Sequence, residues 1–333
     1  MAKKISAILC TYNRCQSLAK ALESLVASIL PATVEWDVLV VDNNSNDGTR
    51  EVVEGFTRLY PGRFRYLFEP RQGKSHALNS GIREAYGEIL VFLDDDVIVR
   101  PDWLWNLTAP LQNGEWAGSG GRILPARAFS LPRWLTLSGP YAMGGILCAH
   151  FDLGEKPGKL DRPPYGTNMA FHKKMFERYG GFRIDMGPGP GSEIRNEDTE
   201  FGRRLMAAGE SLCYVPSAVV YHEVPENRVK REFFLAWWFD YGRAQIREGG
   251  TRPDVWGIPR RYISIPNNVL RILPFRTLRW LLAMKPEQRF HYKCMVWVTA
   301  GHIAEMCRPI FESKRQNETL QDAHRPRNAR CEP

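Results

Sequence analysis

The feature that most constrains the fold is a regular alternation of short apolar runs and helical segments over the first hundred residues. Near-continuous apolar runs are typical of parallel strands buried on both faces, because the crossover helices cover the sheet. The pattern predicts an α/β fold with a mostly parallel central sheet and flanking helices. The predicted strands are 5–10, 37–41, 64–68 and 88–93, and the predicted helices are 18–26, 49–59 and 75–85.

Polar side chains follow each predicted strand. In open α/β sheets, ligands bind outside the carboxyl ends of the strands, so these residues are the first candidates for a nucleotide site. They are Thr11 to Arg14, Asp42 to Ser45, Glu69 to Arg71 and Asp94 to Asp96.

The remainder of the chain divides into two parts. After Pro101 the sequence is irregular and rich in Gly and Pro, and from Arg228 it turns into aromatic and basic helical segments. We therefore expect a catalytic domain over 1–226, with halves 1–100 and 101–226, and a C-terminal helical region over 227–333. Further elements predicted within 101–226 are strands at 118–124, 170–171 and 212–221 and a helix at 197–208.

Charge is distributed unevenly. The 333 residues carry a net charge of +8, but the region from 227 onward has 20 basic and 10 acidic residues, which leaves 25 basic and 27 acidic residues before it.

Seven scattered cysteines without a CxxC pair favour neither a disulfide framework nor a zinc site. The uncharged run from Trp134 to Phe151 contains Gly, Pro and His, so we expect a loop and strand there and not a membrane span. With no signal-peptide pattern, the expected location is cytoplasmic, in solution or peripheral on the inner face of the membrane.

Three consecutive aspartates, Asp94, Asp95 and Asp96, end the fourth predicted strand. Like charges at this spacing repel one another unless a cation lies between them. Strand alternation places Asp94 and Asp96 on one side, where both can bind one Mg²⁺ or Mn²⁺ ion that also contacts a diphosphate. The alternative is that these aspartates only form the turn after the strand.

Four segments together resemble family 2 glycosyltransferases of the GT-A fold, of the non-processive bacterial type. They are ILCTYNR (8–14), LVVDNNSNDGT (39–49), FLDDDV (92–97) and NEDTEFGRRL (196–205), and the resemblance covers about residues 4–225.

The resemblance implies roles for individual residues. It implies nucleotide contacts for Thr11, Asn13, Arg14 and Asp42, donor contacts for Arg71, Lys74, Asp94 and Asp95, and a metal site of Asp94, Asp96 and His222. A carboxylate at Asp42 can accept a hydrogen bond from a uracil N–H, although an Asx-turn would use the same side chain. A solvated loop is the alternative for Arg71 and Lys74, and a structural role is the alternative for His222.

The family's general base is the aspartate of the pair Glu197-Asp198, which implies that Asp198 removes the acceptor's proton and that Glu197 supports it. Direct displacement of this kind inverts the anomeric centre. Helix capping is the alternative, since acidic residues are favoured in a first helical turn. A Gly-Pro stretch, Met186 to Ser192, precedes the pair and suits an acceptor loop.

The C-terminal region combines aromatic and basic residues. Phe234, Trp237, Trp238 and Tyr241 share one helical face, and a second segment mixes Leu270, Leu273, Leu278, Trp280, Leu281 and Leu282 with Arg271, Arg276 and Arg279. These faces either lie on an anionic membrane or pack on the catalytic domain. Nucleic acid is not an expected partner, because the chain has no recognisable module for it. Processive family members carry a Q-x-x-R-W motif and membrane helices in this region. This chain has REFFLAWWFDYGRAQ instead, so a processive polymer synthase is not expected.

These observations predict an inverting, metal-dependent glycosyltransferase that uses Mn²⁺ or Mg²⁺. The expected donor is a nucleotide sugar, UDP-linked in preference to GDP-linked, and the expected acceptor is lipid-linked or a polysaccharide precursor. A sugar-nucleotide pyrophosphorylase and an inactive nucleotide- or membrane-binding module are the alternatives.

Overall fold

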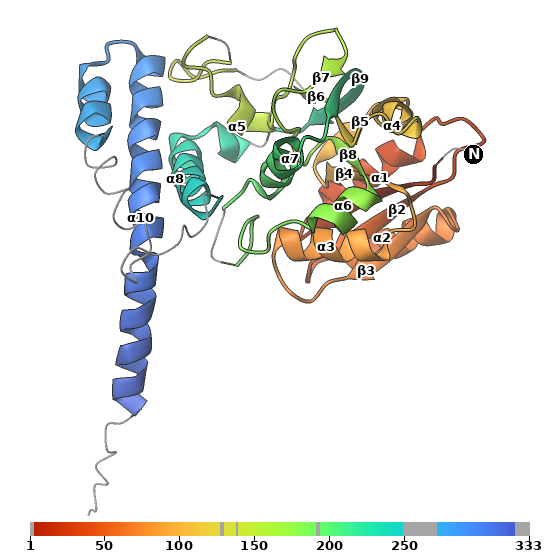
Figure 1. Cartoon of the computed structure of the whole chain (residues 1–333), viewed down its shortest axis with the longest axis horizontal. Coiled ribbons are helices and arrows are strands. Elements are labelled where there is room, and N and C mark those ends of the chain that lie inside the picture. The colour runs from red at the N-terminus through yellow and green to blue at the C-terminus, as the bar shows by residue number, and fades with distance from the viewer. Residues whose placement is uncertain are drawn as a thin grey trace, which may run out of the picture.

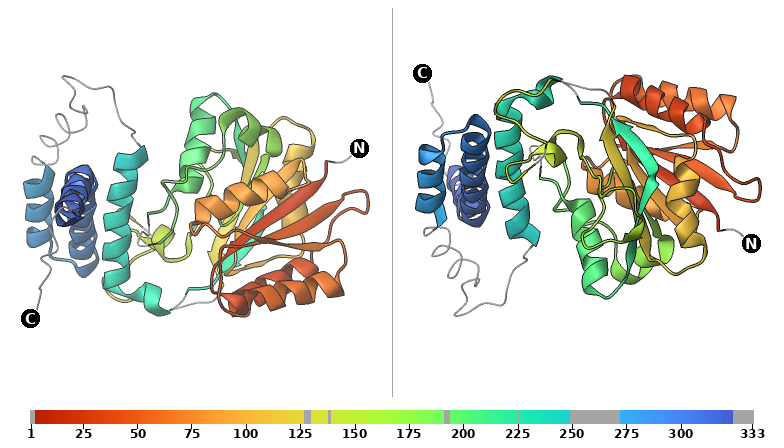
Figure 2. Two further views of the ribbon diagram at one scale, coloured as in Figure 1. Left: turned by 90° about the horizontal axis from the view of Figure 1, so that it is seen from below. Right: turned by 90° about the horizontal axis from the view of Figure 1, so that it is seen from above.

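The computed structural model describes residues 3–126, 130–137, 139–190, 194–224, 226–248 and 272–323. A twisted nine-stranded sheet forms the centre of the N-terminal two-thirds of the chain, with helices on both faces (Figures 1 and 2). Helices from the C-terminal third stack in layers beside this body (Figure 2). The expected α/β fold with a C-terminal helical extension is therefore confirmed.

The parallel half of the sheet follows the predicted alternation closely. Strand β1 lies between β2 and β4, and β3 pairs with β2, all in parallel register. The elements are β1 Ile5–Thr11, α1 Cys15–Val26, β2 Trp36–Asp42, α2 Thr49–Leu59, β3 Phe64–Phe68, α3 Lys74–Glu84 and β4 Ile89–Asp94. Because these strands are parallel, Thr11, Asp42 and Asp94 end at the same edge of the sheet.

The second half of the sheet is mixed, in the order β4-β8-β6-β9-β5, with β7 also paired to β9. Strand β8 is antiparallel to both of its neighbours, so the chain direction reverses in the middle of the sheet. The elements are β5 Val97–Val99, α4 Trp103–Gln112, β6 Gly118–Pro125, β7 Gly158–Lys159, β8 Met169–His172, α6 Lys173–Tyr179, α7 Glu197–Ala207 and β9 Leu212–His222.

A turn at Asp95 and Asp96 carries the chain out of β4 and into β5, at the far end of the sheet order. Strand β5 pairs antiparallel with the end of β9, with Val97 opposite His222. This register brings His222 beside the acidic triplet, although 126 positions separate His222 from Asp96 in sequence.

The segment 134–151 differs from the expectation of a loop and strand. Among its described residues, only Phe151 makes a strand-like bridge, to Ile123, and the segment contains the short helix α5, Gly144–Cys148. Leu135, Met143 and Leu147 are buried in a second apolar cluster together with Phe234 and Phe290 from the C-terminal helices. The C-terminal helices therefore cover part of this run, while Leu137 remains 40% exposed.

The C-terminal helices are η1 Glu226–Val229, α8 Arg231–Glu248, a helix over 272–282, and α10 Pro286–Ala323. Helices α8 and α10 approach closely at two glycines, where an added Cβ on Gly242 would lie 2.2 Å from the Val298 carbonyl oxygen and one on Gly301 would lie 2.0 Å from that of Phe239. Among the described residues, no helix is both long and apolar enough to cross a membrane. Leu270, Arg271, Ser192 and Cys331 of the sequence analysis lie outside the described residues.

Candidate active site

One cavity of about 830 Å³ opens at the carboxyl ends of the parallel strands. It brings together nine of the twelve residues that sequence reasoning selected. These nine are Thr11, Arg14, Lys74, Asp94, Asp95, Asp96, Glu197, Asp198 and His222. Asn13, Asp42 and Arg71 are absent from its lining.

The three residues outside the lining have partners of their own. Asp42 accepts hydrogen bonds from the Ser45 backbone N–H at 2.9 Å and the Tyr66 hydroxyl at 2.8 Å, so its carboxylate holds the segment after β2 through the third residue on, and not through the second as in an Asx-turn. The Arg71 guanidinium pairs with Glu69 at 2.8 Å. Asn13 has φ of 52° and accepts from the Asn46 N–H, which holds the loop after β1. The nucleotide and donor contacts implied for these residues stay predictions.

The acidic triplet is neutralised by cations of the protein itself. Asp94 accepts from Lys74 Nζ at 2.7 Å and from the Thr167 hydroxyl at 2.7 Å. Burial by itself would raise the pKa of Asp94, but Lys74 outweighs it and holds the pKa well below the usual range. Burial also lowers the pKa of Lys74, yet Asp94 and Glu197 raise it above its ordinary value, so this lysine stays charged.

Asp95 and Asp96 share one arginine. Arg14 contacts Asp95 at 3.1 Å and Asp96 at 3.0 Å, and Thr11 donates to Asp95 at 2.7 Å. Burial raises the pKa of Asp95 to about 6, although Arg14 opposes this shift. Repulsion within the triplet therefore does not by itself require a metal ion.

Three side chains form a group with the spacing of a metal site. Ligand atoms of Asp94, Asp96 and His222 all lie within 4.8 Å of one another. Strand alternation predicted that Asp94 and Asp96 lie on one side, but the strand ends at Asp94. The two aspartates come together because Asp95 and Asp96 form a turn. Two carboxylates and an imidazole suit Mn²⁺ or Mg²⁺.

The orientation of His222 supports this fit. Its Nδ1 lies 2.6 Å from the Glu223 carbonyl oxygen, which can only accept, so Nδ1 carries the proton. Its other ring nitrogen, Nε2, lies 3.4 Å from Asp96 and 3.4 Å from the Arg228 guanidinium. A histidine that donates from one ring nitrogen to a backbone carbonyl and presents the other is the usual arrangement of a metal ligand.

The second acidic pair lies at the start of α7. Asp198 accepts from the Gly166 N–H at 2.5 Å and from the Thr199 N–H at 2.7 Å, which orients the carboxylate. Asn196 immediately precedes the helix with a left-handed φ of 78°, a conformation that costs energy for a residue other than glycine. Burial raises the pKa of Glu197 to about 7, against the opposing charge of Lys74, which lies 3.7 Å away.

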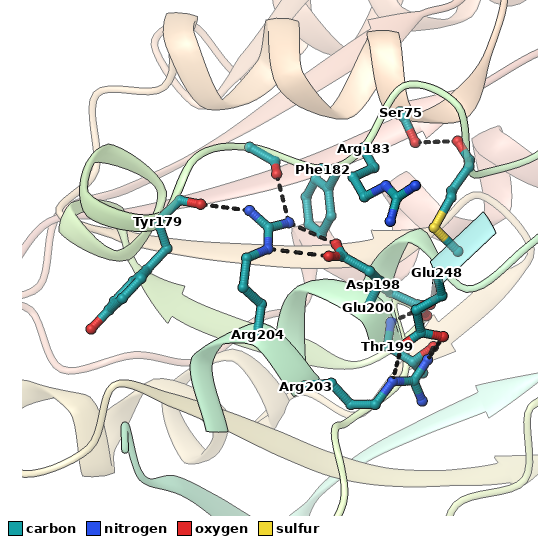
Figure 3. A network of polar contacts seen from close by, with 12 residues as sticks. Ser75, Tyr179, Phe182, Arg183, Asp198, Thr199, Glu200, Arg203, Arg204 and Glu248 are labelled. Carbon is teal, nitrogen blue, oxygen red and sulfur yellow. Dashed lines mark hydrogen bonds and ion pairs between the residues drawn. The ribbon is translucent and has the colours of Figure 1, made fainter. Parts of the chain in front are cut away.

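Arginine side chains hold α7 in place (Figure 3). Arg204 donates to the backbone oxygens of Tyr179 and Gly181 and pairs with Glu200 at 2.7 Å. Arg203 pairs with Glu248 at the end of α8, with Nη2 and Oε2 2.6 Å apart. Figure 3 shows these arginines on the helix that begins beside Asp198, and the Arg203–Glu248 ion pair joins this helix to α8.

The cavity also contains residues that sequence reasoning missed. Asn43 belongs to the strand-end group Asp42 to Ser45 but had no role of its own assigned, and Arg228 lies six positions after His222 and contacts Asp96 at 3.4 Å. Both positions offered a signal, since one follows a strand and the other begins the basic region. Tyr165 and Thr167 lie in an irregular segment without a local pattern.

Aromatic residues of α8 complete the cavity wall. Phe233, Trp237, Trp238 and Tyr241 line it, whereas Phe234 is fully buried among Trp134 and Phe290. The predicted common face of α8 is therefore divided between the cavity and the second apolar cluster. Burial raises the pKa of Tyr165 above its ordinary value. The Arg203–Glu248 ion pair joins α7, which carries Asp198, to α8, which carries the aromatic wall.

Comparison with solved structures identifies the fold class of this chain. A mannosyltransferase of Pyrobaculum calidifontis, PcManGT, solved with GDP-Man and Mn²⁺, superposes with a TM-score of 0.55 at 18% identity, over 98% of this chain and 82% of its own. GalNAc-T7, solved with UDP, GalNAc and Mn²⁺, gives 0.54 at 15% identity over 76% of this chain and 52% of its own. The chain has a GT-A-like fold.

Sequence comparison specifies the family. The model described as Glycosyl transferase family 2 matches residues 6–180. The succinoglycan biosynthesis protein ExoM of Rhizobium meliloti is 30% identical over 246 residues, 73% of this chain and 72% of ExoM. The glycosyltransferase AglE of Haloferax volcanii is 27% identical over 256 residues, 77% of this chain and 75% of AglE. The chain belongs to glycosyl transferase family 2 and is a glycosyltransferase.

Proposed function

We propose that this protein transfers a sugar, with inversion, from a nucleotide sugar to a lipid-linked or polysaccharide-precursor acceptor, and that it depends on Mn²⁺ or Mg²⁺. One observation carries the proposal. Asp94, Asp96 and His222 line the same cavity as Asp198, but they come from different elements, so a leaving-group site and a base can act on opposite sides of one sugar.

Each residue has a defined task in this reaction. Asp198 takes the proton of the acceptor hydroxyl as its oxygen bonds to the anomeric carbon. The bond from that carbon to the diphosphate oxygen breaks at the same time, and its electron pair leaves with the nucleoside diphosphate. Lys74, Arg14 and Arg228 lie where they can bind the negative charge that develops. Asp94, Asp96 and His222 would hold the metal ion, which when bound neutralises diphosphate charge.

The donor nucleotide is proposed as UDP in preference to GDP. PcManGT was solved with GDP-Man and GalNAc-T7 with UDP, so the structural neighbours do not favour one nucleotide. The preference for UDP rests on the Asp42 carboxylate at the end of β2 and on the resemblance of the motifs 8–14 and 39–49 to the family. Asp42 is 2% exposed and lies outside the cavity lining, so its contact with a base would require the residues that cover it to move.

The acceptor is proposed to lie against the aromatic wall of α8, on the side of Asp198. Trp237 and Tyr241 stack in parallel, with ring centres 5.3 Å apart. An aromatic face is electron-rich and attracts the weakly positive C–H groups of a sugar ring. The buried Trp238 Nε1 has no hydrogen-bond partner among the described residues and is a donor available to a hydroxyl. A glucosyl-dolichyl phosphate glucuronosyltransferase of Haloferax volcanii is 25% identical, which favours a lipid-linked sugar.

Thermal-shift measurements with a panel of nucleotide sugars, with and without Mn²⁺, test the proposal. We expect stabilisation by one donor class, increased by Mn²⁺ in the wild-type protein but not in Asp96→Ala. The donor found in this way is then used to measure sugar transfer and the anomeric configuration of the product.

The two alternatives give different results in the same assays. A pyrophosphorylase would convert a sugar phosphate and a nucleoside triphosphate to a nucleotide sugar. An inactive module would bind nucleotide but neither hydrolyse nor transfer the donor sugar. Retention of configuration, or equal metal response in wild type and Asp96→Ala, would contradict the proposal.

A further inference from the structure

The helix over 272–282 and the residue pair after it expose an unusual number of large apolar side chains. Of the sixteen such exposed side chains among the described residues, six lie between 272 and 284. Leu282 is 68% exposed and Met284 is 92% exposed. Contiguous exposed apolar surface marks an interaction site, whereas single exposed residues need no explanation. The six are Ile272, Phe275, Leu278, Leu281, Leu282 and Met284.

The opposite side of this helix packs against α10. Arg276 donates to the Met295 carbonyl oxygen at 2.9 Å and to the Thr299 hydroxyl at 2.7 Å, and Ala283 is buried. Figure 2 shows the helix as the outermost layer, with α10 between it and α8. The helix therefore contacts α10 with one face, and its apolar face points away from α10 and from the central sheet.

The charges around this face are all of one sign. Between 272 and 289 the exposed charged residues are Arg279, Lys285 and Arg289, and the single acidic residue, Glu287, is half-buried. We propose that this apolar and cationic face docks the protein on an anionic lipid bilayer. Leucine, phenylalanine and methionine side chains enter the boundary between headgroups and acyl chains, while arginine and lysine remain with the lipid phosphates.

The charge pattern favours a bilayer over a second copy of this chain. A two-fold dimer brings the same patch of each subunit together, so Arg279, Lys285 and Arg289 would face cations of the partner. Anionic lipid headgroups complement these side chains instead. The inference also separates two surfaces, because the aromatic residues of α8 line the cavity, whereas the outer helix exposes its apolar side chains.

Vesicle co-sedimentation of the full-length protein tests the proposal without any assay of activity. The probes are vesicles of phosphatidylcholine alone and vesicles in which about a third of the lipid is phosphatidylglycerol. We expect binding to the anionic vesicles, weakened by added salt, and little binding to the neutral ones. The double variant Leu278→Asp/Leu282→Asp should lower the partition coefficient by at least about tenfold, because two carboxylates would enter an apolar, anionic boundary.

Control variants separate docking from folding. Leu59→Asp makes the same chemical change at an exposed leucine of α2 and should bind like wild type. Lys285→Glu/Arg289→Glu leaves the apolar residues in place and should also reduce binding to anionic vesicles. Circular dichroism melting checks that each variant folds.

Three results would overturn the proposal. They are unchanged binding of folded Leu278→Asp/Leu282→Asp, equal binding to neutral and anionic vesicles, and a vesicle-free dimer that the same substitutions dissociate. Loss of transferase activity with normal vesicle binding would affect only the proposed function.

Discussion

At the scale of single residues, the site is defined by which carboxylates are already neutralised. Lys74 contacts Asp94 and Arg14 bridges Asp95 and Asp96, whereas backbone N–H groups of Gly166 and Thr199 donate to the oxygens of Asp198, and no ion pair of Asp198 is found among the described residues. A base needs an oxygen that no cation blocks. Asp198 therefore suits proton removal better than any member of the triplet.

Replacing Asp198 by asparagine tests this role. Asparagine keeps the shape, but its single oxygen can accept only one of the two N–H bonds and it cannot take a proton, so kcat should fall by roughly 10²–10⁴-fold. Donor binding, measured by thermal shift, should be unchanged. Asp161→Asn, at an exposed carboxylate, is the matched control. Turnover of Asp198→Asn within about twofold of the control would exclude a general base here.

Glu197 makes the stability depend on pH. Its pKa is about 7 in the folded protein against 4.5 for an ordinary glutamate, so between these pH values the folded chain holds a proton that the unfolded chain releases. The contribution of Glu197 to the free energy of unfolding therefore falls as pH rises from about 4.5 to about 7. The fall contributed by Glu197 is ~3 kcal/mol, at 1.36 kcal/mol for each pH unit.

Glu197→Gln removes this contribution, because glutamine does not titrate. Urea unfolding of variant and wild type at pH 4.5 and pH 8 should show the variant gaining on the wild type by ~3 kcal/mol at the higher pH. Other titrating groups cancel in this difference. A difference that does not change with pH would show that Glu197 is already ionised throughout the range.

At the scale of elements, α8 and α10 are joined through backbone contact at Gly242 and Gly301. Gly301→Ala would place a methyl group 2.0 Å from the Phe239 carbonyl oxygen, so the helices must move apart. We expect a loss of about 1–3 kcal/mol in the free energy of unfolding, reduced by the better helix propensity of alanine.

Gly55 provides the matched control for this substitution. It lies inside α2 with no atom within 4 Å of an added Cβ, so Gly55→Ala should stabilise by about 0.5–1 kcal/mol. Urea unfolding gives both values. Equal effects at the two positions would mean that α8 and α10 can separate at no cost.

At the scale of the whole molecule, the cavity is built from both parts of the chain. Strand ends and α7 supply the acidic groups, and α8, from the C-terminal third, supplies the aromatic wall. The predicted division at residue 226 stays a prediction about sequence organisation. Functionally the two parts share a cavity wall, an apolar cluster and the Arg203–Glu248 ion pair.

Trp237→Ala tests the contribution of the C-terminal part. Removing the indole takes away one face of the wall, so KM for the acceptor should rise by about tenfold or more, while hydrolysis of the donor by water should be preserved. Trp237→Phe keeps an aromatic face and should lose less. Equal loss of hydrolysis and transfer in Trp237→Ala would place Trp237 at the donor and not at the acceptor.

The parallel half of the sheet and its helices could be read from the sequence because local patterns determine them. Apolar runs of strand length separated by helical periodicity predicted β1 to β4 and α1 to α3 with bounds within a few residues. The helix α7 was predicted in the same way. The segment 134–151 was not, because its apolar residues are buried by helices that lie far away in sequence.

The sequence by itself determined the fold class, the family and the positions of both acidic groups, since strand ends and a helix start are local features. Only the tertiary structure decided which of these residues meet. The pairing of β5 with β9 brings His222 to Asp96, Lys74 takes one oxygen of Asp94, and Arg71 turns to Glu69. It also assigned α8 to the cavity and left the helix over 272–282 facing outward. Amphipathic helices look alike in sequence, because a face buried against protein and a face offered to a membrane have the same periodicity.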